Sequence, residues 1–170
     1  MTGDPRTVMR RHDRAMPDEA AIQALLERAA FGVTATSLDD QPFVHTSLFW
    51  YDAPARRIYF HTASTGRTRD NILHNPRVCF SVAEIGRLLP ADTALEFSNE
   101  YASVIAFGQA RLIDDQAHKR HGLQGLLDKY FPALQPGRDY RPITDDELTA
   151  TSVFAVEIES WSGKQKVVAP

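Results

Sequence analysis

The sequence predicts a mainly β protein, built as a six-stranded antiparallel barrel with two or three helices at its periphery. Short segments rich in β-branched residues follow one another at hairpin spacing, which favours an antiparallel meander over βαβ units. A helix expected after the third strand would split the barrel, and barrel closure removes strand edges that an open sheet has to protect. The chain has 170 residues, of which 43% are hydrophobic and 24% charged, values typical of one globular domain.

The chain is expected to begin with a flexible arm over residues 1–15, followed by a single domain over residues 16–170. The arm is polar and rich in arginine. A helix is predicted over residues 16–29, because apolar residues recur there at the spacing of one helical face. Pro17 suits the first turn of that helix, and Gly32 suits the exit from it.

The remaining elements are predicted from changes of period and from turn residues. Strands are expected at 33–38, 43–51, 58–62, 78–83, 101–113 and 152–161. Helices are expected at 68–74 and 116–130, and Thr144 with Glu147 forms a capping box at the start of a further helix. Irregular segments are expected as a long loop at 85–99, an extended linker at 132–142 and a turn at Ser162-Gly163-Lys164.

The charge and the cysteine content exclude several classes of protein. Nineteen Lys and Arg against 22 Asp and Glu give a net charge of −3, so no basic field argues for a nucleic-acid or membrane partner. Cys79 is the single cysteine, which rules out an intramolecular disulfide and a Cys-rich metal site. An unpaired thiol fits a reducing compartment, and no secretory signal or membrane-spanning apolar run is visible, so a cytoplasmic location is expected.

Motifs for metal, nucleophilic or classical nucleotide chemistry are missing from the sequence. No HExxH, G-x-S-x-G, G-x-G-x-x-G or P-loop pattern occurs. His118 and His121 lie three residues apart on one predicted helix, yet no third ligand is in register, so we expect no metal site. Cys79 lies in an apolar strand and is interpreted as a buried, inert thiol.

The end of the third predicted strand carries the residues best suited to chemistry. His61-Thr62-Ala63 ends the strand, a Ser/Thr/Gly turn follows, and Arg67 and Arg69 open a short helix. Hydroxyls, turn amides and a helix N-terminus beside guanidinium groups suit a phosphate monoester. A solvated strand-to-helix turn is the alternative that the residues alone leave open.

The preceding strand suggests a place for a planar ring. Residues 46–50 would run beside the turn in a meander. Backbone amides that face a ring, with Phe49 or Trp50 as an apolar wall, fit an isoalloxazine. Ordinary strand packing is the alternative here.

Several segments together resemble one protein family. They are Tyr59-Phe60-His61-Thr62 with Gly66-Arg67, Glu84-Ile85-Gly86 with Leu89-Pro90, Tyr101-Ala102-Ser103-Val104 with Phe107-Gly108, Arg141-Pro142-Ile143, Glu147-Leu148, Thr151-Ser152-Val153 and Trp161-Ser162-Gly163-Lys164. The pattern resembles the FMN-binding split β-barrel superfamily of pyridoxamine 5'-phosphate oxidase-like proteins, and within it the nitroimidazole-resistance (Nim-type) reductases.

The resemblance implies a homodimer in which two FMN molecules lie in clefts between the chains. It also implies that Arg67 binds the flavin phosphate and that His61 is the catalytic residue. The cofactor-binding residues that it implies are Thr46, Ser47, Leu48, Phe49, Phe60, His61, Thr62, Ala63, Gly66, Arg67, Thr68, Ser103, Trp161 and Lys164.

Two departures from the family pattern bear on function. Many members have Lys after the Gly-Arg pair, whereas this chain has Thr68. The Arg-containing substrate signature of pyridoxine-phosphate oxidases is missing from the C-terminal residues 165–170, so oxidation of pyridoxamine phosphate is not expected.

The expected function is therefore that of an FMN-dependent oxidoreductase that reduces small compounds, nitroaromatic ones included, with NAD(P)H. His61 would orient the substrate or donate a proton, since the ordinary pKa of histidine lies near neutrality; a neutral histidine bonded within the strand is the alternative. A second hypothesis is a flavin- or haem-binding protein with little turnover, in which His45 and His61 serve as axial ligands. A deazaflavin in place of FMN is a further alternative.

Overall fold

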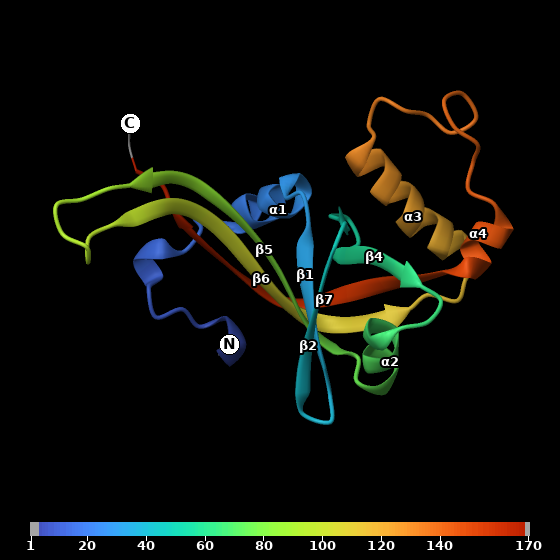
Figure 1. Cartoon of the computed structure of the whole chain (residues 1–170), viewed down its shortest axis with the longest axis horizontal. Helices are drawn as coiled ribbons and strands as arrows, with labels where there is room; N and C mark the ends of the chain where they lie inside the picture. Colours follow the sequence, from blue (N-terminus) through green and yellow to red (C-terminus); the bar gives the residue numbers. More distant parts are fainter. Residues whose placement is uncertain (1–3, 169–170) are drawn as a thin grey trace.

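The computed structural model describes residues 4–168 and shows an antiparallel sheet of seven strands, in the order β2-β1-β5-β6-β7-β4-β3 (Figure 1). The strands are β1 Gly32–Leu38, β2 Gln41–Ser47, β3 Trp50–Asp52, β4 Arg57–Ala63, β5 Arg77–Leu89, β6 Ser98–Leu112 and β7 Thr151–Lys166. The α-helices are α1 Glu19–Arg28, α2 Arg67–His74, α3 Gln116–Tyr130 and α4 Asp145–Ala150. The mainly β class is confirmed, whereas the prediction of six strands is wrong.

The extra strand results from a break in the predicted strand 43–51. Phe49 leaves the sheet ladder: its backbone N–H donates to the hydroxyl of Tyr130, which in turn donates to its carbonyl. The break separates β2 from β3, the two edges of the sheet, with Leu48 and Phe49 as the only residues between them. The sheet therefore curls until its two edges meet at this corner, while the outer edge of β2 stays open.

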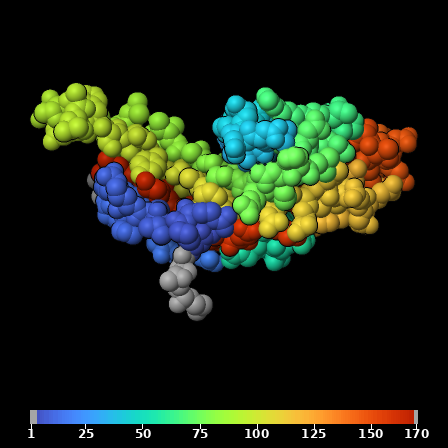
Figure 2. Space-filling view, turned by 90° about the horizontal axis from the view of Figure 1, so that it is seen from below, coloured from blue at the N-terminus to red at the C-terminus, as the bar shows by residue number. Residues whose placement is uncertain are grey.

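A long hairpin replaces the loop predicted over 85–99. β5 and β6 stay paired as far as Leu89 and Ser98, with a register shift between Ile85 and Leu88. Pairing with β6 likewise carries β7 straight through the predicted turn at Ser162-Gly163-Lys164. Cross-strand hydrogen bonds thus override the local turn residues, and the hairpin projects from the body as an arm (Figures 1 and 2).

Three of the helices begin where a side chain caps the first free backbone N–H groups. α1 begins at Glu19, later than predicted, because the side chain of Asp18 accepts a hydrogen bond from the N–H of Ala21. Asp115 caps α3 in the same way, and the predicted capping box of Thr144 with Glu147 is present at α4.

The N-terminal segment lies along β7. Asp4 bonds the hydroxyl of Ser160, Arg6 pairs with Glu159, and the N–H of Met16 donates to the carbonyl of Gly163. Residues 1–3 of the predicted arm, and residues 169–170 of the predicted domain, lie outside the described residues.

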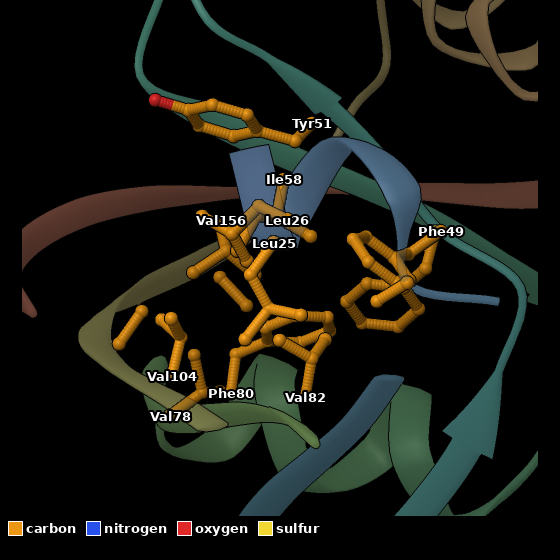
Figure 3. Packing of buried hydrophobic residues seen from close by; sticks show 14 of the residues in the cluster. Leu25, Leu26, Phe49, Tyr51, Ile58, Val78, Phe80, Val82, Val104 and Val156 are labelled. Atoms are coloured by element: carbon orange, nitrogen blue, oxygen red, sulfur yellow. The ribbon is translucent and has the colours of Figure 1, made fainter. Parts of the chain in front are cut away.

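The core occupies two faces of the sheet. Inside the curl, Leu25 and Leu26 of α1 pack with Phe80 of β5 and Val156 of β7 (Figure 3). On the other face, Tyr59 and Val153 pack beneath α3 with Trp50 at their side. These two clusters fix β4 between them, so that its residues alternate between the inside of the curl and the α3 side.

Candidate functional site

One cavity, the α2-turn cavity, lies where β2 and β4 meet the start of α2. Its volume is ≈360 Å³. β2 and β4 are not paired in the sheet, so the cavity occupies the open split beside the outer edge of β2. The residues that line it are Phe43, Val44, His45, Thr46, Thr62, Thr65, Gly66, Arg67, Thr68 and Arg69.

The N-terminus of α2 leaves backbone donors free at this cavity. No side chain caps the helix, and its N-cap is Gly66, with φ 135° and ψ 165°. Only glycine adopts that conformation readily, and the first amides of any helix lack an intrahelical acceptor. An anion at this point would receive backbone hydrogen bonds and the favourable end of the helix dipole.

Two guanidinium groups stand beside these amides. In the part of the chain that the structure describes, Arg67 forms no ion pair, and its guanidinium carbon lies 5.2 Å from the ring centre of Phe43. Arg69 lines the same cavity from the same turn. Asp70 lies in the same helical turn, but neither arginine forms an ion pair with a described residue, so both guanidinium groups are available to a phosphate.

Three of the hydroxyl groups predicted to bind the cofactor differ in their burial and in their hydrogen bonds. Thr68 is buried, and its hydroxyl lies 3.2 Å from Nδ1 of His45. The hydroxyl of Thr62 donates to the carbonyl of Ala63. The hydroxyl of Ser47 is buried with no hydrogen-bond partner among the described residues and faces neither cavity, whereas the exposed Thr46 lines the cavity and its hydroxyl bonds to no described residue.

A second cavity, the α3 cavity, lies between β4 and α3 and has a volume of ≈450 Å³. Its lining consists of Leu48, His61, Leu123, Leu126, Leu127, Tyr130, Phe131, Tyr140, Arg141, Ile143, Glu147 and Thr151. Burial lowers the pKa of His61 below its ordinary value, and the nearby His45 adds to this shift. This shift favours the neutral imidazole, and neither of its nitrogens forms a hydrogen bond with a described residue.

The two cavities share the same two strands. β2 lines the α2-turn cavity with residues 43–46 and reaches the α3 cavity with Leu48, directly after its last residue. On β4, Thr62 faces the first cavity and its neighbour His61 faces the second. A molecule anchored at α2 and lying along the free edge of β2 would reach from the phosphate turn to His61.

The structure brings together part of the predicted cofactor site. Thr46, Thr62, Gly66, Arg67 and Thr68 line the α2-turn cavity, Leu48 and His61 line the α3 cavity, and Ser47 lies between them.

Other predicted residues do not face these cavities. The side chains of Phe49 and Phe60 are fully buried in the core, since each is needed there to pack against another phenylalanine, and Ala63 lines neither cavity. Trp161 lies beside α1, where its Nε1 donates to Glu19, and Ser103 and Lys164 face each other in the β6–β7 pairing. Within one chain, these last three residues stay outside the candidate site.

Sequence reasoning missed the contribution of α3 and of the segment that follows it. Leu126, Tyr130, Tyr140, Arg141 and Glu147 all line the α3 cavity. The apolar face of the helix was a usable signal, because Leu123, Leu126 and Leu127 recur on it at helical spacing. Phe43 was the other omission. Arg69 was recognised with Arg67 as a guanidinium suited to a phosphate, although it was not counted among the cofactor-binding residues.

Residues 4–168 lack two features that would point to other functions. No group of three or more His, Cys, Asp and Glu side chains is arranged to hold a metal ion there. No helix in this range is both long and apolar enough to cross a membrane.

Comparison with known proteins gives one family and several similar folds. The sequence model described as pyridoxamine 5'-phosphate oxidase matches residues 18–165. The flavocytochrome Anf3 from Azotobacter vinelandii has a similar structure, with 28% identity, a TM-score of 0.82 and coverage of 98% of this chain and 76% of that one. No curated protein sequence matches the chain.

Two more distant structures share the fold. A protein described as a putative 5-nitroimidazole antibiotic resistance protein from Bacteroides thetaiotaomicron has 20% identity, a TM-score of 0.74 and coverage of 89% and 86%. The FAD and heme binding protein from Mycobacterium smegmatis has 23% identity, a TM-score of 0.80 and coverage of 92% and 75%.

Proposed function

The chain belongs to the pyridoxamine 5'-phosphate oxidase family, and from this premise we propose that it is an FMN-dependent oxidoreductase that reduces small compounds, nitroaromatic ones among them, with NAD(P)H. The observation that carries the proposal is the α2-turn cavity, where uncapped helix amides and the unpaired Arg67 meet at the open edge of β2. This donor set fits a flavin phosphate. When bound, the flavin supplies the transfer of a hydride from NAD(P)H and of two electrons to the substrate.

The residues of the chain hold and orient the cofactor. Arg67 and the first amides of α2 bind the phosphate, and Gly66 leaves room for it, since nothing lies within 4 Å of a Cβ built at that position. The hydroxyl of Thr46, which lines the cavity, and the unpaired backbone groups of β2 bind the polar edge of the ring. Thr68 supports this arrangement indirectly by fixing the imidazole of His45.

His61 acts on the substrate side. Its neutral imidazole faces the α3 cavity and donates a hydrogen bond, or a proton, to the polar group that is reduced. A neutral donor costs less to desolvate than a charged one, which suits a mainly apolar cavity.

The proposal includes a homodimer in the cytoplasm, with the cofactor between the two chains. A partner chain would supply Ser103, Trp161 and Lys164 to the cofactor, since these residues lie away from the α2-turn cavity of their own chain.

The test is the substitution Arg67→Ala in the purified protein, titrated with FMN. Charge-assisted hydrogen bonds contribute about 1.5–3 kcal/mol, so FMN affinity should fall by about tenfold to a hundredfold. Arg77→Ala is the matched control, because Arg77 is exposed at the start of β5 outside both cavities. FMN affinity that is unchanged in Arg67→Ala would refute the phosphate site.

A second candidate function is that of a flavin- and haem-binding protein. The similarity to a flavocytochrome favours it, and the α3 cavity offers His61 as an axial ligand on a mainly apolar wall. His45 is less suitable than the sequence indicated, because its Nδ1 is bonded to Thr68 and it faces the other cavity. The absorption spectrum recorded in the FMN titration separates the two functions, since haem gives a sharp Soret band.

A further inference from the structure

The walls of the α3 cavity are mainly apolar. Leu123, Leu126 and Leu127 line it from α3, Phe131 follows them, and Leu48 lies on the side of β2. The volume of ≈450 Å³ is in the usual range for small-molecule sites. Such walls bind a ligand chiefly by removing its apolar surface from water.

Most polar side chains that line the cavity already form hydrogen bonds within the protein. The hydroxyl of Tyr130 donates to the carbonyl of Ala30 and also binds the backbone of Phe49, and the hydroxyl of Tyr140 accepts a hydrogen bond from Gln124. His61, in contrast, has no hydrogen bond to any described residue. A ligand that enters the cavity therefore meets the unbonded imidazole of His61, and the O–H of Tyr140, which donates to no described residue.

The charges in the cavity cancel. Among the described residues that line it, two side chains carry a full charge, and Arg141 binds Glu147 at 2.9 Å. Both are more than half exposed, so the pair lies at the mouth and adds little to stability. The pair matters for the charge of the ligand instead. Because its two charges cancel, the cavity has no net charge that would attract an anion or a cation.

We propose that the α3 cavity is the substrate site and that it selects an uncharged, mainly apolar compound, with one polar group directed at His61 and its apolar surface against α3. The proposal rests on the proposed function for the reduction that follows binding. An anionic compound would lose hydration without gaining a free cation, since the guanidinium of Arg141 is already paired.

The experiment compares two fluorescent probes of the same ring size, neutral phenyl-naphthylamine and anionic anilinonaphthalene sulfonate. We expect the purified protein to bind the neutral probe at least about tenfold more tightly than the anionic probe. Leu127→Trp, which fills the cavity, should abolish binding of the neutral probe. Equal affinities for both probes in the native protein would overturn the proposal.

Glu147→Gln is the decisive variant because it removes charge without removing the helix cap. Glutamine also completes a capping box, so α4 stays intact while Arg141 loses its neutralising partner. Affinity for the anionic probe should rise about fivefold, a modest gain because the site is exposed, and affinity for the neutral probe should stay the same. Asp146→Asn, at an exposed position of the same helical turn, is the matched control and should change neither.

The outcomes separate this proposal from the proposed function. One outcome is that FMN binds as expected while the neutral probe binds the Leu127→Trp variant as tightly as it binds the native protein. That result would refute the substrate site and support the flavin site. If the probes behave as expected but FMN does not bind, the flavin site is wrong and the apolar site stands. A protein purified with haem that blocks the neutral probe would overturn the assignment of the cavity to substrate.

Discussion

His61 lies on β4 next to both cavities, and its protonation links the site to stability. Burial lowers its pKa in the folded state, so below pH 6.5 the unfolded chain takes up a proton that the folded chain does not. The folded state should therefore lose stability as the pH falls from about 6.5 toward the lowered pKa of this histidine.

This prediction is checked with His61→Gln. The melting temperature of the native protein should fall between about pH 7 and about pH 5, and part of that fall should disappear in the variant. His74→Gln, at the exposed end of α2, serves as the control and should keep the native slope. Identical slopes in all three proteins would mean that His61 is not desolvated in the folded chain.

The helix α3 depends on two aromatic rings beneath it. Trp50 and Tyr59 stack with their ring centres 5.3 Å apart, and two glycines of α3 lie directly over them. Two side-chain pairs also link the helix to the sheet: Tyr59 with His118 at 2.7 Å, and Asp52 with His121 at 2.9 Å. Because the helix forms one wall of the α3 cavity, its packing against these rings determines the shape of the cavity.

Gly125→Ala tests this packing. A Cβ at position 125 would lie 2.2 Å from the ring of Trp50, so the helix has to move outward. Overpacking of this kind costs about 1–3 kcal/mol, and we expect the free energy of unfolding in urea to fall by that amount. Binding of the neutral naphthalene probe should weaken as well, whereas Gln116→Ala, at the exposed start of α3, should change neither measurement.

Elements that depend on neighbouring residues were predictable from the sequence. The turn between β4 and α2 was one, because the strand end, Gly66 and Arg67 follow one another along the chain. The break at Phe49 was not predictable in this way, since it is satisfied by Tyr130, 81 residues further on. The α3 cavity was missed for the same reason: its lining comes from Leu48 after β2, from β4, α3, α4 and β7, and from the segment between the two helices.

The arm formed by β5 and β6 is the feature of the whole molecule that most needs a partner. Its exposed apolar residues include Ile85, Leu88, Leu95 and Phe97, of which Leu88 is 74% exposed. The arm lies at the opposite end of the molecule from α3 and α4 (Figures 1 and 2). An apolar strip on a projecting hairpin is costly in water, and a second copy of the chain, as proposed above, would cover it.

Leu88→Glu should therefore convert the proposed dimer into a monomer, because a carboxylate would be buried in the interface without a partner. Light scattering measures the mass, and an FMN titration of the same sample measures the cofactor site. If the partner chain completes that site, FMN affinity should fall together with the mass, although the α2 turn is untouched. Leu134→Glu introduces the same charge at an exposed leucine of the segment after α3 and should leave both mass and affinity unchanged. A native protein that is monomeric with FMN bound would show that one chain is sufficient, and the roles proposed for Ser103, Trp161 and Lys164 would then fall.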